Sequence, residues 1–317
     1  MRLETLGIDR SVSVLFPPER LLENLRDLPV ETVLVDADSN TDSNSESNTT
    51  ARCDGVVTFE YRPSLLDASW VHSVQAGVDR FPQERFREAN VLLTNSTGVH
   101  GDAIGETVAG YMLAFARRLH THVANQRGKR WSRPEWDEPW TIAGERACVV
   151  GLGSLGRGVV DRASGLGLDV DGVRRTPVPE PGVDRIYTPD ALETAVSDAR
   201  FVVLAVPLTS ETEGMIDADV LAAMREDAYL INVARGPVVD ERALVRALED
   251  GGIAGAALDV FETEPLPESS PLWEMDEVIV TPHAAGAARH YCDHVASVVG
   301  ESVRRIRAGG DPVNRVC

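Results

Sequence analysis

The segment Val149–Val160, with the sequence VVGLGSLGRGVV, most constrains how this chain can fold. A short apolar run enters a G-x-G-x-x-G turn formed by Gly151, Gly153 and Gly156, and a helical pattern follows. In such a unit the first glycine allows a tight turn, the second lets the backbone approach a pyrophosphate, and the third lets the helix lie close to the strand. Free N–H groups and the dipole at the helix start favour an anion. The segment therefore predicts a dinucleotide site, although an ordinary tight turn has the same composition.

The rest of the chain alternates apolar runs with helical patterns, which indicates parallel sheets covered by helices. Strands are expected at Ser11–Phe16, Thr32–Val35, Gly55–Phe59, Val71–Val74, Val91–Leu93, Leu168–Val173, Phe201–Val206, Leu230–Val233, Gly255–Asp259 and Val278–Val280. Helices are expected at Glu19–Leu28, Gly98–His120, Arg157–Gly165, Ala218–Met224, Glu241–Asp250 and Ala287–Ala308.

A chain of 317 residues is long for one core, so we expect two domains. The residues before Gly98 form an α/β unit of their own, and the closing helix must return to some part of the fold. The expected fold class is α/β with two doubly wound parallel sheets. A Rossmann-type cofactor domain (98–287) is inserted into a flavodoxin-like substrate domain (1–97 plus 288–317).

The charge balance excludes nucleic acid as a partner. Fifty Asp and Glu face 31 basic residues, among which Lys129 is the only lysine, and the net charge is −19. Such a chain offers no basic footprint for phosphates. Self-repulsion at this charge is relieved in molar salt, where the Debye length is about 3 Å. We therefore favour an enzyme from a salt-accumulating halophile. The alternative is a protein from a GC-rich genome, which favours Arg over Lys, with incidental acidity.

The cysteine pattern and the lack of a long apolar run predict a cytoplasmic protein that neither binds a metal nor spans a membrane. The four cysteines are scattered thiols rather than a disulfide frame or a metal site: Cys53, Cys148, Cys292 and Cys317. No apolar run approaches the roughly 20 residues of a membrane span, and no secretion signal opens the chain. The polar segment Asp38–Thr50 is expected to be a surface loop, with a regulatory tail as the alternative.

Three tryptophans, Trp131, Trp136 and Trp140, lie close together between the long expected helix and the glycine turn. Pro134 and Pro139 interrupt this segment, so it cannot be a regular core helix. The tryptophans either pack over the edge of the domain or dock on another subunit, and the sequence does not choose between the two.

The end of the second strand of the cofactor domain carries Arg174, Arg175 and Thr176. In a dinucleotide fold this position, about 20 residues after the glycines, meets the adenosine ribose, and an acid there binds the 2′-hydroxyl of NAD. Asp169 and Asp171 lie inside the strand, out of position for that contact. Two guanidiniums and a hydroxyl suit a 2′-phosphate, which predicts NADPH over NADH. A pair of exposed surface arginines is the alternative.

Arg235, Glu264 and His283 each follow an expected strand. Because ligands lie beyond the carboxyl ends of parallel strands, the three could face one cleft. Arg235 can clamp a carboxylate and polarise a carbonyl, His283 can exchange a proton near neutral pH, and Glu264 can orient the imidazole. Taken singly, they could be a surface ion pair, a turn cap and a loop residue.

The motifs GLGSLGR, AVPLT, NVARGPVVD, ALDVFETEPLP and VIVTPHAAG, in this order, resemble those of the D-isomer-specific 2-hydroxyacid dehydrogenases. The resemblance runs from about Val71 to Gly286 and implies a two-domain enzyme with Arg235, Glu264 and His283 as catalytic residues. It implies hydride transfer from a nicotinamide cofactor and dimerisation through the cofactor domain. Arg235 and His283 would also bind the substrate.

The resemblance implies further contacts. The backbone of Gln75, Ala76, Gly77 and Val78 would hold the substrate carboxylate. Asp259 would bind the nicotinamide carboxamide near the Val233 carbonyl. The cofactor site would also include Ser154, Leu155, Val206, Pro207, Thr209, Ala234 and Ala285.

Two positions depart from the family pattern. Arg174 stands where many members keep an Asp, and Gly105–Glu106 replaces the usual Ala–Glu step. No regulatory domain follows, so serine feedback is not expected. The expected function is NADPH-preferring reduction of 2-ketocarboxylic acids to D-2-hydroxy acids. A formate or phosphite dehydrogenase and a dinucleotide-sensing, corepressor-like protein are the alternatives.

Overall fold

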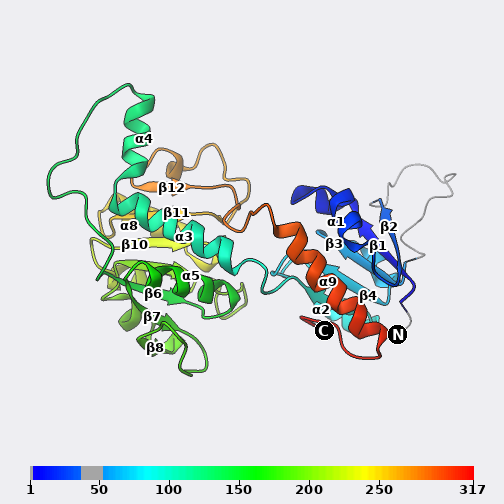
Figure 1. Ribbon diagram of the computed structural model, residues 1–317. Coiled ribbons are helices and arrows are strands. Elements are labelled where there is room, and N and C mark those ends of the chain that lie inside the picture. Colours follow the sequence, from blue (N-terminus) through cyan, green and yellow to red (C-terminus); the bar gives the residue numbers. More distant parts are fainter. Residues whose placement is uncertain (1–2, 37–52) are drawn as a thin grey trace. The chain divides into compact units, whose positions relative to one another are not determined.

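The structure is a computed structural model that describes residues 3–36 and 53–317. The chain divides into two compact units, Met1–Val99 with Ala287–Cys317, and His100–Gly286 (Figure 1). The polar segment Asp38–Thr50 lies outside the described residues. Among the described helices, none is both long enough and apolar enough to cross a membrane.

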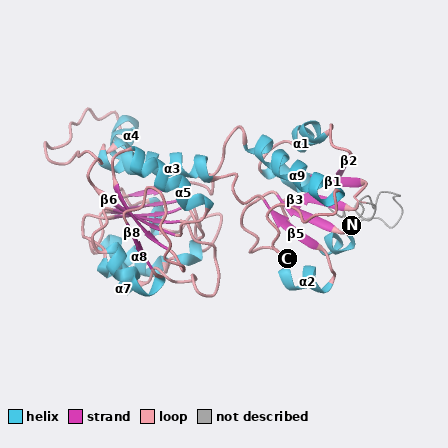
Figure 2. Ribbon diagram, turned by 60° about the horizontal axis from the view of Figure 1, so that its bottom comes forward, coloured by secondary structure: helices cyan, strands magenta, loops and turns pink. Residues whose placement is uncertain are grey.

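The first unit is a parallel five-stranded sheet in the order β2-β1-β3-β4-β5, which is the flavodoxin-like order. Its strands are β1 (Thr5–Asp9), β2 (Glu31–Val35), β3 (Gly55–Thr58), β4 (Trp70–Ser73) and β5 (Leu92–Asn95). Its helices are α1 (Pro18–Leu25), α2 (Gln83–Glu88) and α9 (Tyr291–Arg307). Helices α1 and α9 pack on one face of the sheet and α2 on the other, so the closing helix returns to the first unit (Figure 2).

The second unit is a parallel seven-stranded sheet in the order β12-β11-β10-β9-β6-β7-β8. Its strands are β6 (Arg146–Val150), β7 (Asp169–Val173), β8 (Arg185–Tyr187), β9 (Phe201–Leu204), β10 (Tyr229–Asn232), β11 (Gly255–Leu258) and β12 (Val278–Val280). Its helices are α3 (Gly101–Ala116), α4 (Leu119–Arg127), α5 (Ser154–Gly165), α6 (Leu192–Val196), α7 (Ala218–Ala223) and α8 (Glu241–Glu249). The order reverses direction between β6 and β9, which is the Rossmann-type switch point.

Successive strand residues of the second unit enter two different cores. Cys148 and Val150 pack with α6, α7 and α8 on one face, while Ala147 and Val149 pack with α3 and α5 on the other. Both faces are therefore buried, as a doubly wound sheet requires. The α/β fold with a dinucleotide-binding domain inserted into a second parallel-sheet domain is confirmed (Figure 2).

Glycines let α3 and α5 touch backbone to backbone. A Cβ on Gly105 would lie 2.2 Å from the Gly158 carbonyl oxygen, and one on Gly158 would lie 1.9 Å from the Gly101 carbonyl oxygen. No side chain fits at such distances. The glycine in the Gly105–Glu106 step is therefore a packing requirement of this helix pair.

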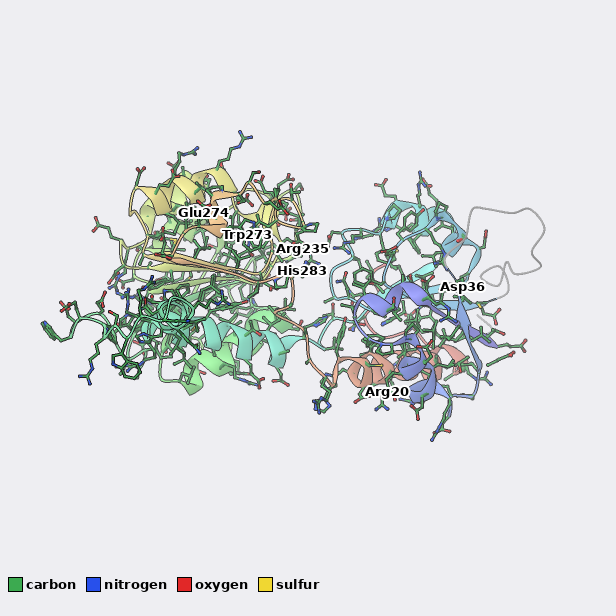
Figure 3. The ribbon with its side chains drawn as sticks, turned by 90° about the horizontal axis from the view of Figure 1, so that it is seen from above. Arg20, Asp36, Arg235, Trp273, Glu274 and His283 are labelled. Atoms are coloured by element: carbon green, nitrogen blue, oxygen red, sulfur yellow. The ribbon has the colours of Figure 1, made fainter. Side chains whose placement is uncertain are left out.

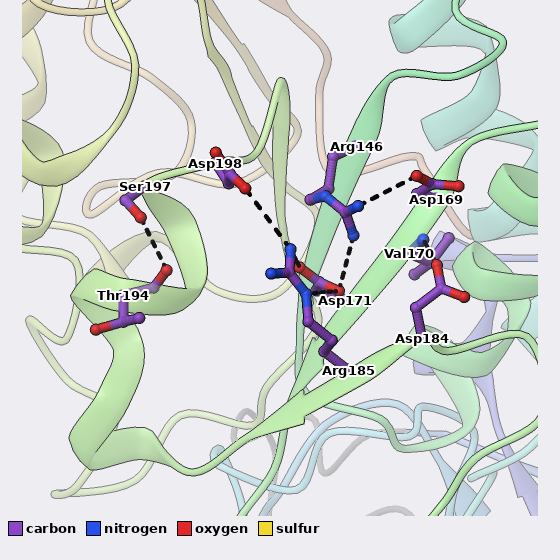
Figure 4. A network of polar contacts seen from close by, with 9 residues as sticks. All are labelled: Arg146, Asp169, Val170, Asp171, Asp184, Arg185, Thr194, Ser197 and Asp198. Atoms are coloured by element: carbon purple, nitrogen blue, oxygen red, sulfur yellow. Dashed lines mark hydrogen bonds and ion pairs between the residues drawn. The ribbon is translucent and has the colours of Figure 1, made fainter.

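The acids inside β7 are held by arginines on the neighbouring strands (Figure 4). Asp171 is buried and pairs with Arg146 of β6 at 3.1 Å and with Arg185 of β8 at 2.7 Å. Asp169, the first residue of β7, also pairs with Arg146, at 3.1 Å. Both carboxylates therefore stabilise the sheet, and neither lies at the carboxyl end of β7.

Two expected elements differ from the structure. The strand expected at Ser11–Phe16 is wrong: β1 lies earlier, and a 3-10 helix, Arg10–Val14, begins because the Asp9 carboxylate accepts the Ser11 N–H at 2.7 Å. The helix expected over Gly98–His120 is two helices, since Arg118 adopts φ +52° and ends the first. The short edge strand β8 was not expected.

Only one of the three tryptophans of this segment packs on the domain, and docking of the others on another subunit stays a prediction. Trp140 packs on the domain, with the Arg200 guanidinium 4.3 Å from its ring centroid and Phe201 beneath. Trp131 and Trp136 are 98% and 90% exposed. We refer to residues 119–139, which include α4 and these two tryptophans, as the arm.

Candidate functional site

The glycine turn between β6 and α5 has the geometry of a pyrophosphate cradle. Gly151 adopts φ +100°, a conformation that favours glycine. A Cβ on Gly156 would lie 1.8 Å from the Gly151 carbonyl oxygen, so the helix start lies directly on the turn. By contrast, a Cβ on Gly153 would have no atom of any described residue within 4 Å, apart from those of Gly153 and its neighbours in the chain. The turn therefore leaves open space at the glycine that is predicted to face the cofactor.

The start of α5 also fits an anionic group. The helix begins at Ser154, directly after the turn, and has 12 residues, so its dipole and first N–H groups lie beside the open space. Ser154 and Leu155 are half-buried there. When a nicotinamide dinucleotide binds, the segment from Gly153 to Gly156 would hold its pyrophosphate.

These different surroundings predict different effects for two glycine variants. Gly156→Ala forces a Cβ into backbone and is expected to lower the free energy of unfolding by about 1–3 kcal/mol. Gly153→Ala leaves the fold intact and weakens dinucleotide binding at least tenfold, because its methyl group enters the space of the pyrophosphate. Thermal unfolding and calorimetric titration with NADP⁺ measure the two effects. Equal melting temperatures for both variants would contradict this division.

Arg174, at the carboxyl end of β7, is engaged by an acid that sequence reasoning missed. Its Nη1 donates to Glu180 Oε2 at 3.1 Å. Arg157 of α5 donates from Nη2 to the same Oε2 at 3.2 Å, and its Nε lies 2.9 Å from Oε1 in an ion pair. Arg175 and Thr176 are exposed, and Arg175 Nη1 lies 3.9 Å from Glu211 Oε2. The predicted 2′-phosphate residues thus share their surroundings with a carboxylate.

The loop after β9 is closed by its own hydroxyl groups. Thr212 Oγ1 donates to the Pro207 carbonyl at 2.6 Å and accepts the Thr209 N–H at 2.9 Å. Val206 is half-buried, while Pro207 and Thr209 are exposed. The three predicted cofactor contacts therefore lie on one ordered loop at the carboxyl end of β9.

Arg235 is placed by a turn after β10 that a buried amide braces. Asn232 accepts the Ala234 N–H at 3.0 Å and donates to the Arg235 carbonyl at 3.0 Å. Arg235 Nη1 donates to the Ala234 carbonyl at 2.8 Å. A Cβ on Gly236 would lie 1.9 Å from the Phe261 carbonyl carbon, so this turn packs against the segment that leads to Glu264. Val233 and Ala234 are buried in the turn.

His283 and Glu264 form a hydrogen-bonded pair. His283 Nδ1 lies 2.9 Å from Glu264 Oε2, and Glu264 Oε1 accepts the Phe261 N–H at 3.3 Å. An ionised carboxylate only accepts, so the contact requires a proton on Nδ1 and directs Nε2 away from Glu264. His283 adopts φ +50°, a conformation that non-glycine residues adopt chiefly where the surroundings impose it.

Asp259 holds the backbone of the His283 loop. Its Oδ1 accepts the Thr281 hydroxyl at 2.6 Å and the Ala284 N–H at 2.8 Å, and its Oδ2 accepts the Ala285 N–H at 2.9 Å. The side chain is buried. Its assignment to the nicotinamide carboxamide stays a prediction. Thr281, which follows β12, is a positioning residue that the sequence alone did not reveal.

The sheet register brings these segments to one edge. Asn232 of β10 pairs with Leu258 of β11, and Leu258 pairs with Val280 of β12. The turns after these three adjacent strands carry Arg235, the Asp259–Glu264 segment and His283. Figure 3 shows Arg235 and His283 at the same end of this sheet.

The predicted substrate loop belongs to the first unit and follows β4. The Gln75 carbonyl accepts the Ser96 N–H at 3.0 Å, and the Ala76 carbonyl accepts Asn95 Nδ2 at 2.7 Å. Within the described residues, the N–H groups of Ala76, Gly77 and Val78 donate to no acceptor. The loop is therefore tied down through its carbonyls and presents successive donors, an arrangement suited to an anion.

Comparison with known proteins identifies the family. Residues 109–285 match the family described as D-isomer specific 2-hydroxyacid dehydrogenase, NAD binding domain. The glyoxylate reductase of Korarchaeum cryptofilum is 34% identical over 265 residues, 81% of this chain and 78% of its own. The glyoxylate reductase of Pyrococcus horikoshii is 34% identical over 268 residues, with the same shares of the two chains.

A solved structure extends the similarity to the whole chain. The D-isomer specific 2-hydroxyacid dehydrogenase of Xanthobacter autotrophicus, in complex with NADPH and MES, is 32% identical with a TM-score of 0.83. The match covers 100% of this chain and 98% of that one. The chain therefore belongs to the D-isomer specific 2-hydroxyacid dehydrogenase family and is an NAD(P)-dependent enzyme of that class.

Proposed function

We propose that the protein reduces small 2-ketocarboxylic acids to D-2-hydroxy acids with NADPH as the preferred cofactor. Glyoxylate is the first substrate to test, because relatives that align with most of the chain bear the name glyoxylate reductase. The cofactor preference is supported by Arg174, Arg175 and Thr176 at the end of β7, where no acid follows the strand directly.

The proposed mechanism uses a proton donor, its orienting carboxylate and a guanidinium. The bound cofactor supplies the hydride to the keto carbon. His283 donates the proton to the developing alkoxide through Nε2, while Glu264 accepts the hydrogen bond of Nδ1 and orients the ring. Arg235 binds the substrate carboxylate with its fork of N–H donors and polarises the adjacent carbonyl.

The loop after β4 is proposed to provide the second grip on the substrate. The N–H groups of Ala76, Gly77 and Val78 would bind the carboxylate, as their lack of acceptors in the described residues suggests. We accordingly propose that residues 1–97 and 288–317 form the substrate domain and that residues 98–287 form the dinucleotide-binding domain.

The observation that carries the proposal is the 2.9 Å contact between His283 and Glu264 on the strand end beside Arg235. A spectrophotometric panel tests it, with glyoxylate, hydroxypyruvate, pyruvate and branched keto acids against NADPH and NADH. Formate and phosphite with the oxidised cofactors test the competing reactions. Turnover of formate or phosphite alone, or cofactor binding without turnover of any keto acid, would contradict the proposal.

The panel should be run in dilute buffer and in molar KCl. The net charge of −19 supports the proposal that the protein comes from a salt-accumulating halophile. We expect activity to fall on desalting and to return with KCl. Full activity and stability in dilute buffer would contradict a salt requirement.

We propose that two copies associate through the arm of the dinucleotide-binding domain. Besides its two exposed tryptophans, the arm exposes Leu119 and Val123, so apolar surface gathers there. The variant carrying Trp131→Ser and Trp136→Ser is expected to shift a dimer toward monomer in light scattering. Trp273→Ser removes another exposed tryptophan and serves as the control. A monomeric wild type, or a double variant that stays dimeric, would contradict the proposal.

A further inference from the structure

Glu180 lies between two arginines beside the proposed 2′-phosphate residues. Its carboxylate accepts hydrogen bonds from Arg157 at 3.2 Å and from Arg174 at 3.1 Å, and its Oε1 lies 2.9 Å from Arg157 Nε in an ion pair. Its side chain is only 12% exposed. The group is therefore held by two charge-assisted hydrogen bonds and a further ion-pair contact, and it is largely shielded from water.

The loop that carries Glu180 is stiff. Pro177, Pro179 and Pro181 alternate with other residues, which restricts the backbone on both sides of the acid. Gly182 packs against α5, since a Cβ there would lie 3.0 Å from Val160 Cγ1.

Both ends of the loop are hydrogen-bonded to the sheet. The Arg174 N–H donates to the Tyr187 carbonyl at 3.0 Å, and the Asp184 N–H donates to the Val170 carbonyl at 2.7 Å. Because the loop is anchored at both ends, a movement of the loop would not readily carry the Glu180 carboxylate away from Arg174.

A 2′-phosphate at the end of β7 would have to share Arg174 with this carboxylate. The single negative charge of Glu180 cancels one of the two positive charges of Arg157 and Arg174, so the three side chains together offer the phosphate a net charge of only one unit. Arg175 compensates little, because its side chain is 86% exposed and its charge is screened by water and salt.

We infer that Glu180 is a specificity-determining residue that limits how strongly the protein prefers a 2′-phosphorylated dinucleotide. The inference rests on the proposed placement of the 2′-phosphate at Arg174, Arg175 and Thr176. The acid that disfavours the 2′-phosphate then lies on the β7–β8 loop and not at the end of β7 itself.

Calorimetric titration with NADP⁺ and NAD⁺ tests the inference without any turnover. The two ligands differ only in the 2′-phosphate, so the ratio of their dissociation constants reports that group. Glu180→Gln is expected to shift the ratio toward NADP⁺ by about fivefold to tenfold, the order expected for one unit charge near a phosphate. Glu180→Asp keeps the charge and should keep the wild-type ratio. Glu249→Gln, an exposed change of equal charge on α8, is the control.

The remaining outcomes separate the possible roles. If Glu180 only braces the loop, Glu180→Gln weakens both dinucleotides alike and leaves their ratio unchanged, which would overturn the inference. A shift of the ratio toward NAD⁺ would also overturn it, because Glu180 would then hold Arg174 in place for the phosphate. A shift toward NADP⁺ that shrinks as KCl rises supports it. Failure to reduce keto acids with dinucleotide binding intact would count against the proposed function alone.

Discussion

Replacing His283 with glutamine is expected to lower kcat for keto-acid reduction by about 10²- to 10⁴-fold, the range for loss of a general acid. Glutamine retains polar atoms but cannot deliver a proton to the developing alkoxide near neutral pH. The dissociation constant of NADPH should change little, because His283 itself is not among the proposed cofactor contacts. Steady-state kinetics with glyoxylate and fluorescence titration with NADPH measure the two quantities.

The matched control is His290→Gln, which alters an exposed imidazole whose Nδ1 lies 3.8 Å from Asp293 Oδ2. This variant should behave as the wild type does. If His283→Gln retained most of the wild-type kcat, another group would have to supply the proton. The role assigned to the His283–Glu264 pair would then be wrong.

The second large effect is expected for Arg235→Lys, which keeps the positive charge but removes the planar fork. We expect kcat/KM for the keto acid to fall by about 10²-fold, because a single donor to a developing oxyanion is worth about 3 kcal/mol. Lysine also cannot reproduce the Nη1 hydrogen bond to the Ala234 carbonyl while binding a carboxylate in a bidentate manner. Kinetics over a range of glyoxylate concentrations separate the effects on kcat and KM.

Arg246→Lys on the exposed face of α8 is the control for the same exchange. It should leave both kinetic constants unchanged. Kinetics of Arg235→Lys indistinguishable from those of the control would show that Arg235 does not grip the substrate. Loss of thermal stability in Arg235→Lys alone would point to a structural effect, and melting temperatures should therefore be compared as well.

The parts of the fold that depend on local pattern could be predicted from the sequence. Gly151 and Gly156 have different surroundings in the turn, and each matches the role predicted from its place in the motif. Apolar runs in the sequence also predict most of the buried strands. The strand expected at Ser11–Phe16 failed because an apolar alternation does not reveal that the Asp9 side chain caps a 3-10 helix there.

The residues that position the candidate site could not be predicted in this way. Thr281 reaches Asp259, and Glu180 reaches Arg157, across separations set by the path of the chain in three dimensions. Asn232 lies inside the expected strand Leu230–Val233, and the sequence alone does not reveal that its amide braces the turn of Arg235. Motifs and strand ends indicated where chemistry could occur, whereas the supporting contacts depend on which turns the sheet register makes neighbours.

The outermost strands of the larger sheet, β8 and β12, are three residues long. Strands of this length offer few unsatisfied backbone groups to another molecule, and Arg185 adds a charge at the start of one of them. Joining of two copies into a continuous sheet is therefore disfavoured, as is growth into aggregates along this direction. A contact between copies at either edge of this sheet would then have to be made by side chains, which single substitutions can change without disturbing the backbone hydrogen bonds.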